Sequence, residues 1–204
     1  MWKFDNDIAN IYDEHVRQHI PNYELVIKKS CDVAIEVCKP ADNICDFGCA
    51  NGATLDKLAS LGFKNLYGVD TSIDMLNKCA SKYHLSCSMF PNVKFKLILA
   101  NWVVHFNHNK VDILKLMFNS LQDNGYFILS EKVSVNPFII KQYYKIKEQN
   151  GVSKKTIKEK EVMLQGSMHV DNVYYYLKTF NELGFTEIEI IDASWGFATF
   201  FCRK

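Results

Sequence analysis

The segment spanning residues 44–70 constrains the fold of this chain more than any other part of it. It opens with a short apolar run, residues 44–47, and continues into a turn that contains Gly48 and Gly52. A helical stretch follows, and a second apolar run ends on Asp70. Glycines let the backbone N–H groups of a tight turn approach a ligand, and a strand-end carboxylate can accept hydrogen bonds from both ribose hydroxyls. The segment therefore predicts a nucleoside site at the edge of a parallel sheet.

The glycine spacing separates this turn from the dinucleotide-binding fingerprint. Ala50 stands where that fingerprint has its second glycine, and Gly52 follows two residues later. The order Asp46-x-Gly48-x-Ala50-x-Gly52 resembles motif I of the class I S-adenosylmethionine-dependent methyltransferases, whose loop holds a methionine tail in place of a pyrophosphate. The alternative is a strand-to-helix turn of some other α/β protein. The loop, the Asp46 carboxylate and the strand-end Asp70 together favour the nucleoside interpretation.

Length and composition indicate one globular domain, residues 1–204. The 204 residues are 48% hydrophobic and 23% charged, which is ordinary, and the net charge of +1 gives no general attraction to nucleic acid or anionic lipid. No apolar run is long enough to span a bilayer, and the first residues lack the basic and apolar regions of a signal peptide. We therefore expect a cytoplasmic protein that binds no membrane.

The seven cysteines give little support to a metal site. They are odd in number and form no C-x-x-C pair, so we expect no bound metal and thiols kept reduced in a cytosol. Cys49 lies inside the ligand loop. It is either a reactive thiol at a helix N-terminus or a small side chain whose backbone N–H matters, and we favour the second.

The remaining pattern predicts an α/β protein of Rossmann-like, class I methyltransferase type. Apolar residues at helical spacing from Phe4 to His15 indicate an amphipathic helix that Pro21 ends, so residues 1–40 form a helical lid. We expect a mostly parallel seven-stranded sheet with a C-terminal antiparallel hairpin and a helical insertion over residues 135–170. The expected strands are 44–47, 66–70, 85–89, 95–100, 126–131, 186–192 and 195–202. After the first helix of the lid, the expected helices are 25–37, 54–61, 71–79, 111–121 and 173–183.

Across most of its length the chain resembles one branch of that superfamily, the carboxy-S-adenosylmethionine synthases. The resemblance rests on short blocks in a shared order: Phe4-Asp5, Pro21-Asn22-Tyr23, residues 97–102, residues 129–132, Asn150-Gly151, Met163-Leu164 and residues 171–185. It implies S-adenosyl-L-methionine as cofactor, prephenate as carboxyl donor, a product used in tRNA wobble-uridine modification, and a homodimer. The cofactor contacts that it implies are Tyr23, Gly48, Cys49, Ala50, Asp70, Thr71 and Asn101, with Gly52 in the loop, Met89 bordering the adenine and Asp46 near the methionine amino group.

One position departs from that branch. The family has an arginine two residues before its Met-Leu pair, and this chain has Glu161. A guanidinium pairs with a carboxylate through two parallel bonds, whereas a glutamate would repel it. Lys158 or Lys160 could substitute, but the simplest inference is methyl transfer from unmodified S-adenosylmethionine. Glu161 is thus a candidate substrate-binding position that separates the two chemistries.

Two residues beyond Asn101 are candidates for the acceptor side. His105 is a candidate base or, equally, a loop histidine bonded to backbone; Trp102 either stacks on a planar acceptor or forms an apolar wall. The stretch from Lys141 to Lys160 contains seven lysines and only two glutamates. This composition suits a nucleic-acid patch or, as we prefer, a solvated helical face. Three functions follow: a methyltransferase for a small molecule or an exposed nucleotide, a carboxy-S-adenosylmethionine synthase, and a non-catalytic cofactor-binding subunit.

Overall fold

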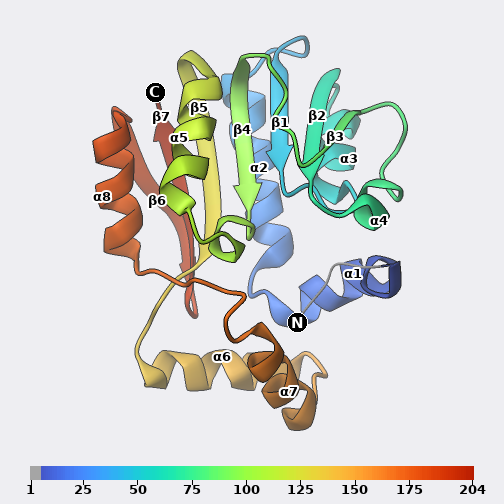
Figure 1. Ribbon diagram of the computed structural model, residues 1–204, viewed down its shortest axis with the longest axis vertical. Helices are drawn as coiled ribbons and strands as arrows, with labels where there is room; N and C mark the ends of the chain where they lie inside the picture. Colours follow the sequence, from blue (N-terminus) through green and yellow to red (C-terminus); the bar gives the residue numbers. More distant parts are fainter. Residues whose placement is uncertain (1–5) are drawn as a thin grey trace.

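The computed structural model describes residues 6–204, and in them a mixed sheet carries helices on both faces (Figure 1). The strand order is β3-β2-β1-β4-β5-β7-β6. The strands are β1 (Asn43–Phe47), β2 (Asn65–Asp70), β3 (His84–Cys87), β4 (Phe95–Asn101), β5 (Leu121–Lys132), β6 (Glu187–Ser194) and β7 (Phe197–Arg203). The helices are α1 (Asn6–His19), α2 (Tyr23–Val37), α3 (Ala53–Ser60), α4 (Ile73–Leu76), η1 (Val104–Phe106), α5 (Lys110–Ser120), α6 (Pro137–Gln149), α7 (Lys154–Leu164) and α8 (Val173–Leu183).

Strands β1 to β5 run parallel, and β7 pairs antiparallel with both β5 and β6. The predicted fold class is therefore confirmed, including the C-terminal hairpin. Strand β4 shows why: its residues 97–100 are all fully buried, since helices cover both faces of a central parallel strand. Alternate side chains of β4 enter two separate cores, Leu97 and Leu99 on one face and Ile98 and Ala100 on the other.

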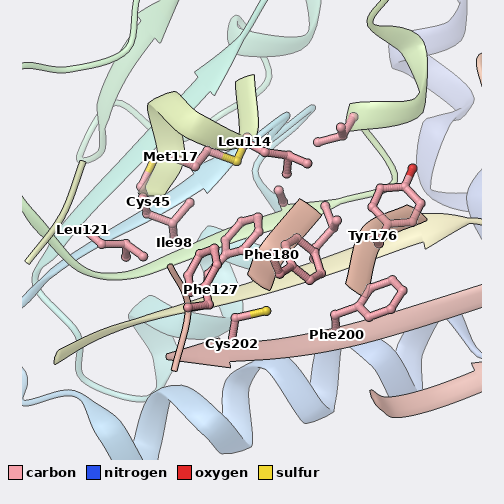
Figure 2. Close-up of a cluster of buried hydrophobic side chains, with 14 of the residues drawn as sticks. Cys45, Ile98, Leu114, Met117, Leu121, Phe127, Tyr176, Phe180, Phe200 and Cys202 are labelled. Carbon is pink, nitrogen blue, oxygen red and sulfur yellow. The ribbon is translucent and has the colours of Figure 1, made fainter. Parts of the chain in front are cut away.

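The larger core lies between the sheet and the pair α5 and α8. Figure 2 shows Met117 of α5 and Phe180 of α8 above Phe127 and Phe200 of the sheet. The second core lies under α2 and α3 on the opposite face. Together they produce three layers, which leave the carboxyl ends of the parallel strands as the edge at which a ligand can enter.

Two segments cover that edge. Helix α1 and the pair α6 and α7 lie beyond the carboxyl ends of the strands, apart from the helices that flank the sheet (Figure 1). The expected helical insertion is thus present as α6 and α7. Of the residues expected to form the lid, α1 lies over this edge, whereas α2 packs on a face of the sheet. Phe4 and Asp5, which were expected to begin the lid, lie outside the described residues. No helix within residues 6–204 has the length and apolar character needed to cross a membrane.

Several sequence-based boundaries were wrong, among them the start of β5, which lies at Leu121 and not at residue 126. Trp195 was expected to open a strand, but Trp195 and Gly196 have φ of 46° and 86° and form the two-residue turn between β6 and β7. The helix expected to reach Cys79 ends at Leu76, because the N–H of Cys79 bonds the carbonyl of Leu76, three residues back. Strand β3 ends at Cys87, since Ser88 adopts φ of 66°.

Candidate functional site

A cavity of about 420 Å³ opens at the carboxyl ends of β1, β2 and β4. The strand order reverses between β1 and β4, and ligands of open α/β sheets bind at such a reversal. Its lining includes Gly48 and Ala50 after β1, Asp70 and Thr71 at the end of β2, and Asn101 at the end of β4. The tertiary structure therefore brings five of the predicted cofactor residues to one cavity.

Gly48 starts the loop after β1 in a conformation that favours glycine. Its φ is +77°, and a Cβ there would lie 2.6 Å from the side chain of Val103. The N–H groups of Gly48 and Cys49 both donate to the carbonyl of Val69, at 2.7 and 3.1 Å. Gly52, with φ of 86°, precedes α3 and lies outside the cavity lining. The loop is thus held by β2 before any ligand arrives.

Asp70 is a fixed hydrogen-bond acceptor at the cavity wall. One carboxylate oxygen accepts the Ala50 N–H at 2.9 Å, and the other accepts the Ser72 N–H at 2.8 Å. Burial raises the pKa of Asp70, while the N–H groups of Ser72, Ala50 and Thr71 act against that rise. A carboxylate has about four acceptor sites, so beside these N–H groups Asp70 can still accept a hydrogen bond from the ribose.

Asn101 places an unpaired amide group on the cavity wall. Both polar atoms of its side-chain amide are buried, and neither has a hydrogen-bond partner among the described residues. Buried polar groups are nearly always paired in folded proteins, so an unpaired amide on a cavity wall indicates a ligand with its own donors and acceptors. The polar groups of S-adenosylmethionine fit this requirement.

The backbone around this cavity is strained. Ala50, Ser88 and Trp102 are non-glycine residues with φ of 47°, 66° and 56°, and all three line the cavity. Each such conformation costs about 1–3 kcal/mol and persists only where surrounding contacts impose it. For Trp102 one such contact is the bond from its N–H to the Ser130 carbonyl, at 2.6 Å. Three of the six non-glycine residues with positive φ in the described part of the chain thus line this one cavity, and backbone strain is often found at functional sites.

A small recess beside the loop holds Asp46, Tyr23 and Cys49. Asp46 is 2% exposed, and burial together with the nearby Asp70 carboxylate raises the pKa of Asp46 to about 7. The Tyr23 ring stacks on Trp102 with centroids 5.0 Å apart. The hydrogen bond with the Cys79 thiol, followed by burial, raises the pKa of the Cys49 thiol, so Cys49 is not arranged as a thiolate nucleophile.

The Asp46 carboxyl predicts a pH dependence of stability. The folded protein binds this proton more tightly than the unfolded chain, whose carboxyl has the usual pKa of 3.8. The free energy of unfolding should therefore fall as pH rises from about 4 to about 7 and then level off. Urea titrations of cofactor-free protein across this range should show the fall, and Asp46→Asn should remove it. An equal slope in wild type and variant would contradict the assignment.

The structure places two residues, Met89 and Tyr12, differently from the sequence-based expectation. Met89 was expected to border the adenine, but its side chain is 73% exposed and Ser88 lines the cavity instead. Tyr12 was considered only as part of an apolar helix face, yet it lines both the main cavity and the recess. Its position in α1, at helical spacing from Ile8 and His15, was the available signal. It could not distinguish a core residue from a cavity residue.

His105 is held by a buried carboxylate. Glu131, fully buried in β5, accepts the His105 Nδ1–H at 2.7 Å and the N–H groups of Val103, Val104 and His105 at 3.1, 2.8 and 2.8 Å. The Tyr176 hydroxyl donates to it at 3.4 Å. Glu131 therefore holds the turn after β4, and with it Trp102. In the sequence Glu131 is only one member of the segment 129–132 that carries the family resemblance, and nothing there indicates this role.

A second cavity of about 110 Å³ adjoins the first and shares Tyr12, Trp102 and Phe106 with it. His105 and Lys160 line this second cavity, and Glu161 does not. The exposed Glu161 side chain accepts the Tyr144 hydroxyl at 2.6 Å. Glu161 therefore lines neither cavity, so it is not placed to repel a carboxylate bound in one of them. Among the described residues no group of three or more His, Cys, Asp or Glu could hold a metal ion.

Comparison with known proteins identifies the family to which this fold and this cavity belong. A family model described as a methyltransferase domain matches residues 12–152. Carboxy-S-adenosyl-L-methionine synthases of Nautilia profundicola and Haemophilus ducreyi are 26% and 24% identical, covering 100% and 92% of this chain and 94% and 86% of their own.

Solved structures agree in fold. An S-adenosylmethionine-dependent methyltransferase from Archaeoglobus fulgidus superposes with a TM-score of 0.68 at 14% identity, over 95% of this chain and 99% of its own. A magnesium protoporphyrin IX methyltransferase from Synechocystis, solved with bound S-adenosylhomocysteine, gives 0.66 at 11% identity, over 92% and 86%. The chain belongs to the class I S-adenosylmethionine-dependent methyltransferases, and S-adenosylmethionine is its cofactor.

Proposed function

We propose that this chain is a methyltransferase that acts on a small molecule. The observation that carries the proposal is the second cavity, which continues the cofactor cavity past Trp102 and is lined in part by residues of α1, α6 and α7. A cavity of about 110 Å³ suits a small acceptor better than an exposed nucleotide. It also argues against a non-catalytic cofactor-binding subunit, for which no space beyond the cofactor is needed.

When bound, S-adenosylmethionine supplies an activated methyl group on its sulfonium. The protein's part is to hold an acceptor in line with that methyl, and Trp102 and Tyr12 lie where the two cavities meet. If the acceptor is a hydroxyl or an amine it must also lose a proton. His105 donates from Nδ1 to Glu131, which leaves Nε2 as the unprotonated nitrogen and a candidate base.

The His105 role predicts a loss of rate without a loss of cofactor. His105→Gln should lower kcat by about 10²- to 10⁴-fold, the usual contribution of a general base. The affinity for S-adenosylhomocysteine should stay within a factor of two, as measured by calorimetry. The acidic limb of the pH–rate profile should also disappear. A kcat within threefold of wild type would return His105 to a purely structural role.

The second candidate is a carboxy-S-adenosylmethionine synthase, which uses prephenate and feeds tRNA wobble-uridine modification. Similarity to synthases along the whole chain favours it. Glu161 in place of the arginine disfavours it, although Lys160 supplies a cation at the second cavity. The ranking of the two functions therefore depends on what the cofactor becomes during turnover.

One experiment separates these functions. The protein is incubated with S-adenosylmethionine, with or without prephenate, and with a panel of small acids, amines and phenols, and the cofactor is analysed by mass spectrometry. We expect S-adenosylhomocysteine together with a methylated member of the panel, and no product specific to prephenate. A cofactor that gains one carboxylate would instead establish the synthase.

We also propose a homodimer, as the resemblance implies. Phe138 on α6 and Val162 on α7 are 65% and 59% exposed, whereas Tyr143 is buried within the chain and donates to the His19 carbonyl at 2.9 Å. Light scattering should give twice the mass of the chain, and Phe138→Asp should halve it. A monomeric wild type would remove the dimer from the proposal. A cytoplasmic location remains a prediction of the sequence.

A further inference from the structure

Two cysteines from different elements meet beside the cofactor loop. Cys49 belongs to the loop after β1, and Cys79 follows the end of α4. A hydrogen bond joins their thiols, and both sulfurs lie near the Ala50 carbonyl oxygen, 3.9 Å from Cys49 Sγ and 3.3 Å from Cys79 Sγ. A Cβ at Gly52 would lie 3.0 Å from Cys79 Sγ. The segment after α4 is therefore packed directly on the loop.

The two thiols differ in reactivity. Cys79 is partly exposed, whereas Cys49 is only 4% exposed. The hydrogen bond between them lowers the pKa of the Cys79 thiol and raises the pKa of the Cys49 thiol. The thiolate is the form of cysteine that attacks a peroxide, and the cysteine that reacts first combines a low pKa with access to solvent. Cys79 is therefore the sulfur that is attacked first by an oxidant, and Cys49 is the sulfur that reacts second.

Cysteines elsewhere in the chain lack this arrangement. Burial raises the pKa of three buried thiols outside the pair, those of Cys31, Cys45 and Cys202. Exposed Cys87 has the Ser88 hydroxyl beside its sulfur, 3.7 Å away. Reversible oxidation to a disulfide needs a reactive thiol with a second thiol next to it. Among the described residues, Cys49 and Cys79 meet this requirement.

We propose that Cys49 and Cys79 form a redox-modification site, at which a hydroperoxide oxidises the pair to a disulfide and the disulfide weakens the binding of S-adenosylmethionine. The pair stays reduced until a peroxide reaches it. The inference goes beyond the proposed reaction and rests only on the cofactor site. It therefore holds for methyl transfer and for carboxylation of the cofactor alike.

The chemistry balances with one hydrogen peroxide for each disulfide. The Cys79 thiolate attacks one peroxide oxygen, the O–O bond breaks, and a sulfenic acid forms while the other oxygen leaves as water with the proton that Cys79 had lost. Since the Cys79 thiol is then gone, the main cause of the raised pKa of Cys49 is removed. The Cys49 sulfur displaces the hydroxyl from Cys79 and forms the S–S bond, and the hydroxyl leaves as water with the Cys49 proton. The two thiols thus lose two electrons, which reduce the peroxide.

The disulfide has to move the wall of the cofactor cavity. An S–S bond is about 2.0 Å long, shorter than any hydrogen bond between two sulfurs, so Cys49 and the segment after α4 must approach each other. Cys49 adjoins Ala50, whose N–H donates to Asp70 and whose φ of 47° depends on surrounding contacts. Helix α4 places Met75 on the wall of the same cavity. A shift on either side therefore deforms the cavity, and S-adenosylmethionine binds less tightly.

The test compares reduced and oxidised full-length protein. Hydrogen peroxide is added, the excess is removed, and peptide mapping by mass spectrometry identifies the linked cysteines. We expect a disulfide between Cys49 and Cys79, an affinity for S-adenosylhomocysteine that is at least tenfold lower by calorimetry, and full recovery after dithiothreitol. Because linkage is reciprocal, a tenfold effect means that saturating S-adenosylhomocysteine raises the reduction potential of the pair by about 30 mV.

Three variants separate the two steps from a general effect of peroxide. Cys79→Ser should bind S-adenosylhomocysteine within twofold of wild type before and after peroxide, since its hydroxyl can still donate to the Ala50 carbonyl. Cys79→Ala replaces it if serine disturbs folding. Cys49→Ser should stop the reaction at a Cys79 sulfenic acid, which dimedone labels. Cys38→Ser is the matched control, because Cys38 is also partly exposed and lies outside the cofactor cavity lining, and it should respond to peroxide as wild type does.

Three results would overturn the proposal. The first is a peroxide-treated protein without the link between Cys49 and Cys79. The second is a linked protein whose affinity for S-adenosylhomocysteine stays within twofold of the reduced form. The third is an equal loss of affinity in Cys79→Ser, which would assign the effect to another oxidised residue. Since every readout is cofactor binding and not turnover, none of these results bears on which reaction the protein catalyses.

Discussion

Asp70→Ala should weaken the binding of S-adenosylmethionine by at least 100-fold. The Asp70 carboxylate lines the cofactor cavity and can accept a ribose hydroxyl beside the N–H groups that it already binds. A hydrogen bond to a charged group contributes about 1.5–3 kcal/mol, and a loss of about 2.8 kcal/mol weakens binding 100-fold. The variant also releases the Ala50 N–H, which loosens the loop after β1. Calorimetric titration of S-adenosylhomocysteine measures the effect directly.

Asp123→Ala is the matched control for that variant. Asp123 is exposed near the start of β5, between Leu121 and Gly125, and is not part of the cavity lining. It should bind S-adenosylhomocysteine with wild-type affinity. An Asp70→Ala protein that is folded by circular dichroism and binds as tightly as this control would show that Asp70 does not hold the ribose.

Glu131→Ala should reduce the free energy of unfolding more than any other single change considered for this chain. The carboxylate is fully buried and accepts hydrogen bonds from Val103, Val104 and His105. Without it, these buried donors have no acceptor and a cavity remains. Removing one member of such a network costs about 3–5 kcal/mol. Urea unfolding followed by tryptophan fluorescence provides the measurement.

The comparison for this variant is Glu189→Gln on the exposed edge strand β6. That change should shift the free energy of unfolding by less than about 0.5 kcal/mol, as surface substitutions usually do. Glu131→Gln keeps the side-chain shape and should lie between the two. A Glu131→Ala protein within about 1 kcal/mol of wild type would mean that the turn after β4 is held by other contacts.

The cofactor side of the site was largely predictable from local sequence. Gly48, Ala50 and Asp70 lie within one strand-turn-helix-strand unit, whose geometry brings the loop against the end of the next strand. Asn101 could be added because a fourth parallel strand must end at the same edge. Met89 is not part of the cavity lining, because β3 is short and ends before it, which leaves the residue exposed.

The substrate side was not predictable in the same way. Lys132, Lys147 and Lys160 come from a strand and two helices, and no sequence spacing reveals that they share a cavity. In the sequence Lys147 and Lys160 belong to the lysine-rich stretch 141–160, which suits a solvated helical face, and exposed Lys158 does have that character. Tyr12 was missed for the same reason, since a helix face alone does not identify what covers it.

The sequence by itself determined the fold class and the cofactor, because the motif from Asp46 to Asp70 is contiguous and its turn geometry is dictated locally by glycine. Only the tertiary structure decided which charge faces the second cavity. Successive residues of a helix point about 100° apart, so Lys160 and Glu161 cannot both face inward. The packing of α7 against α1 and α6 turns Lys160 toward the cavity and leaves Glu161 on the surface, bonded to Tyr144.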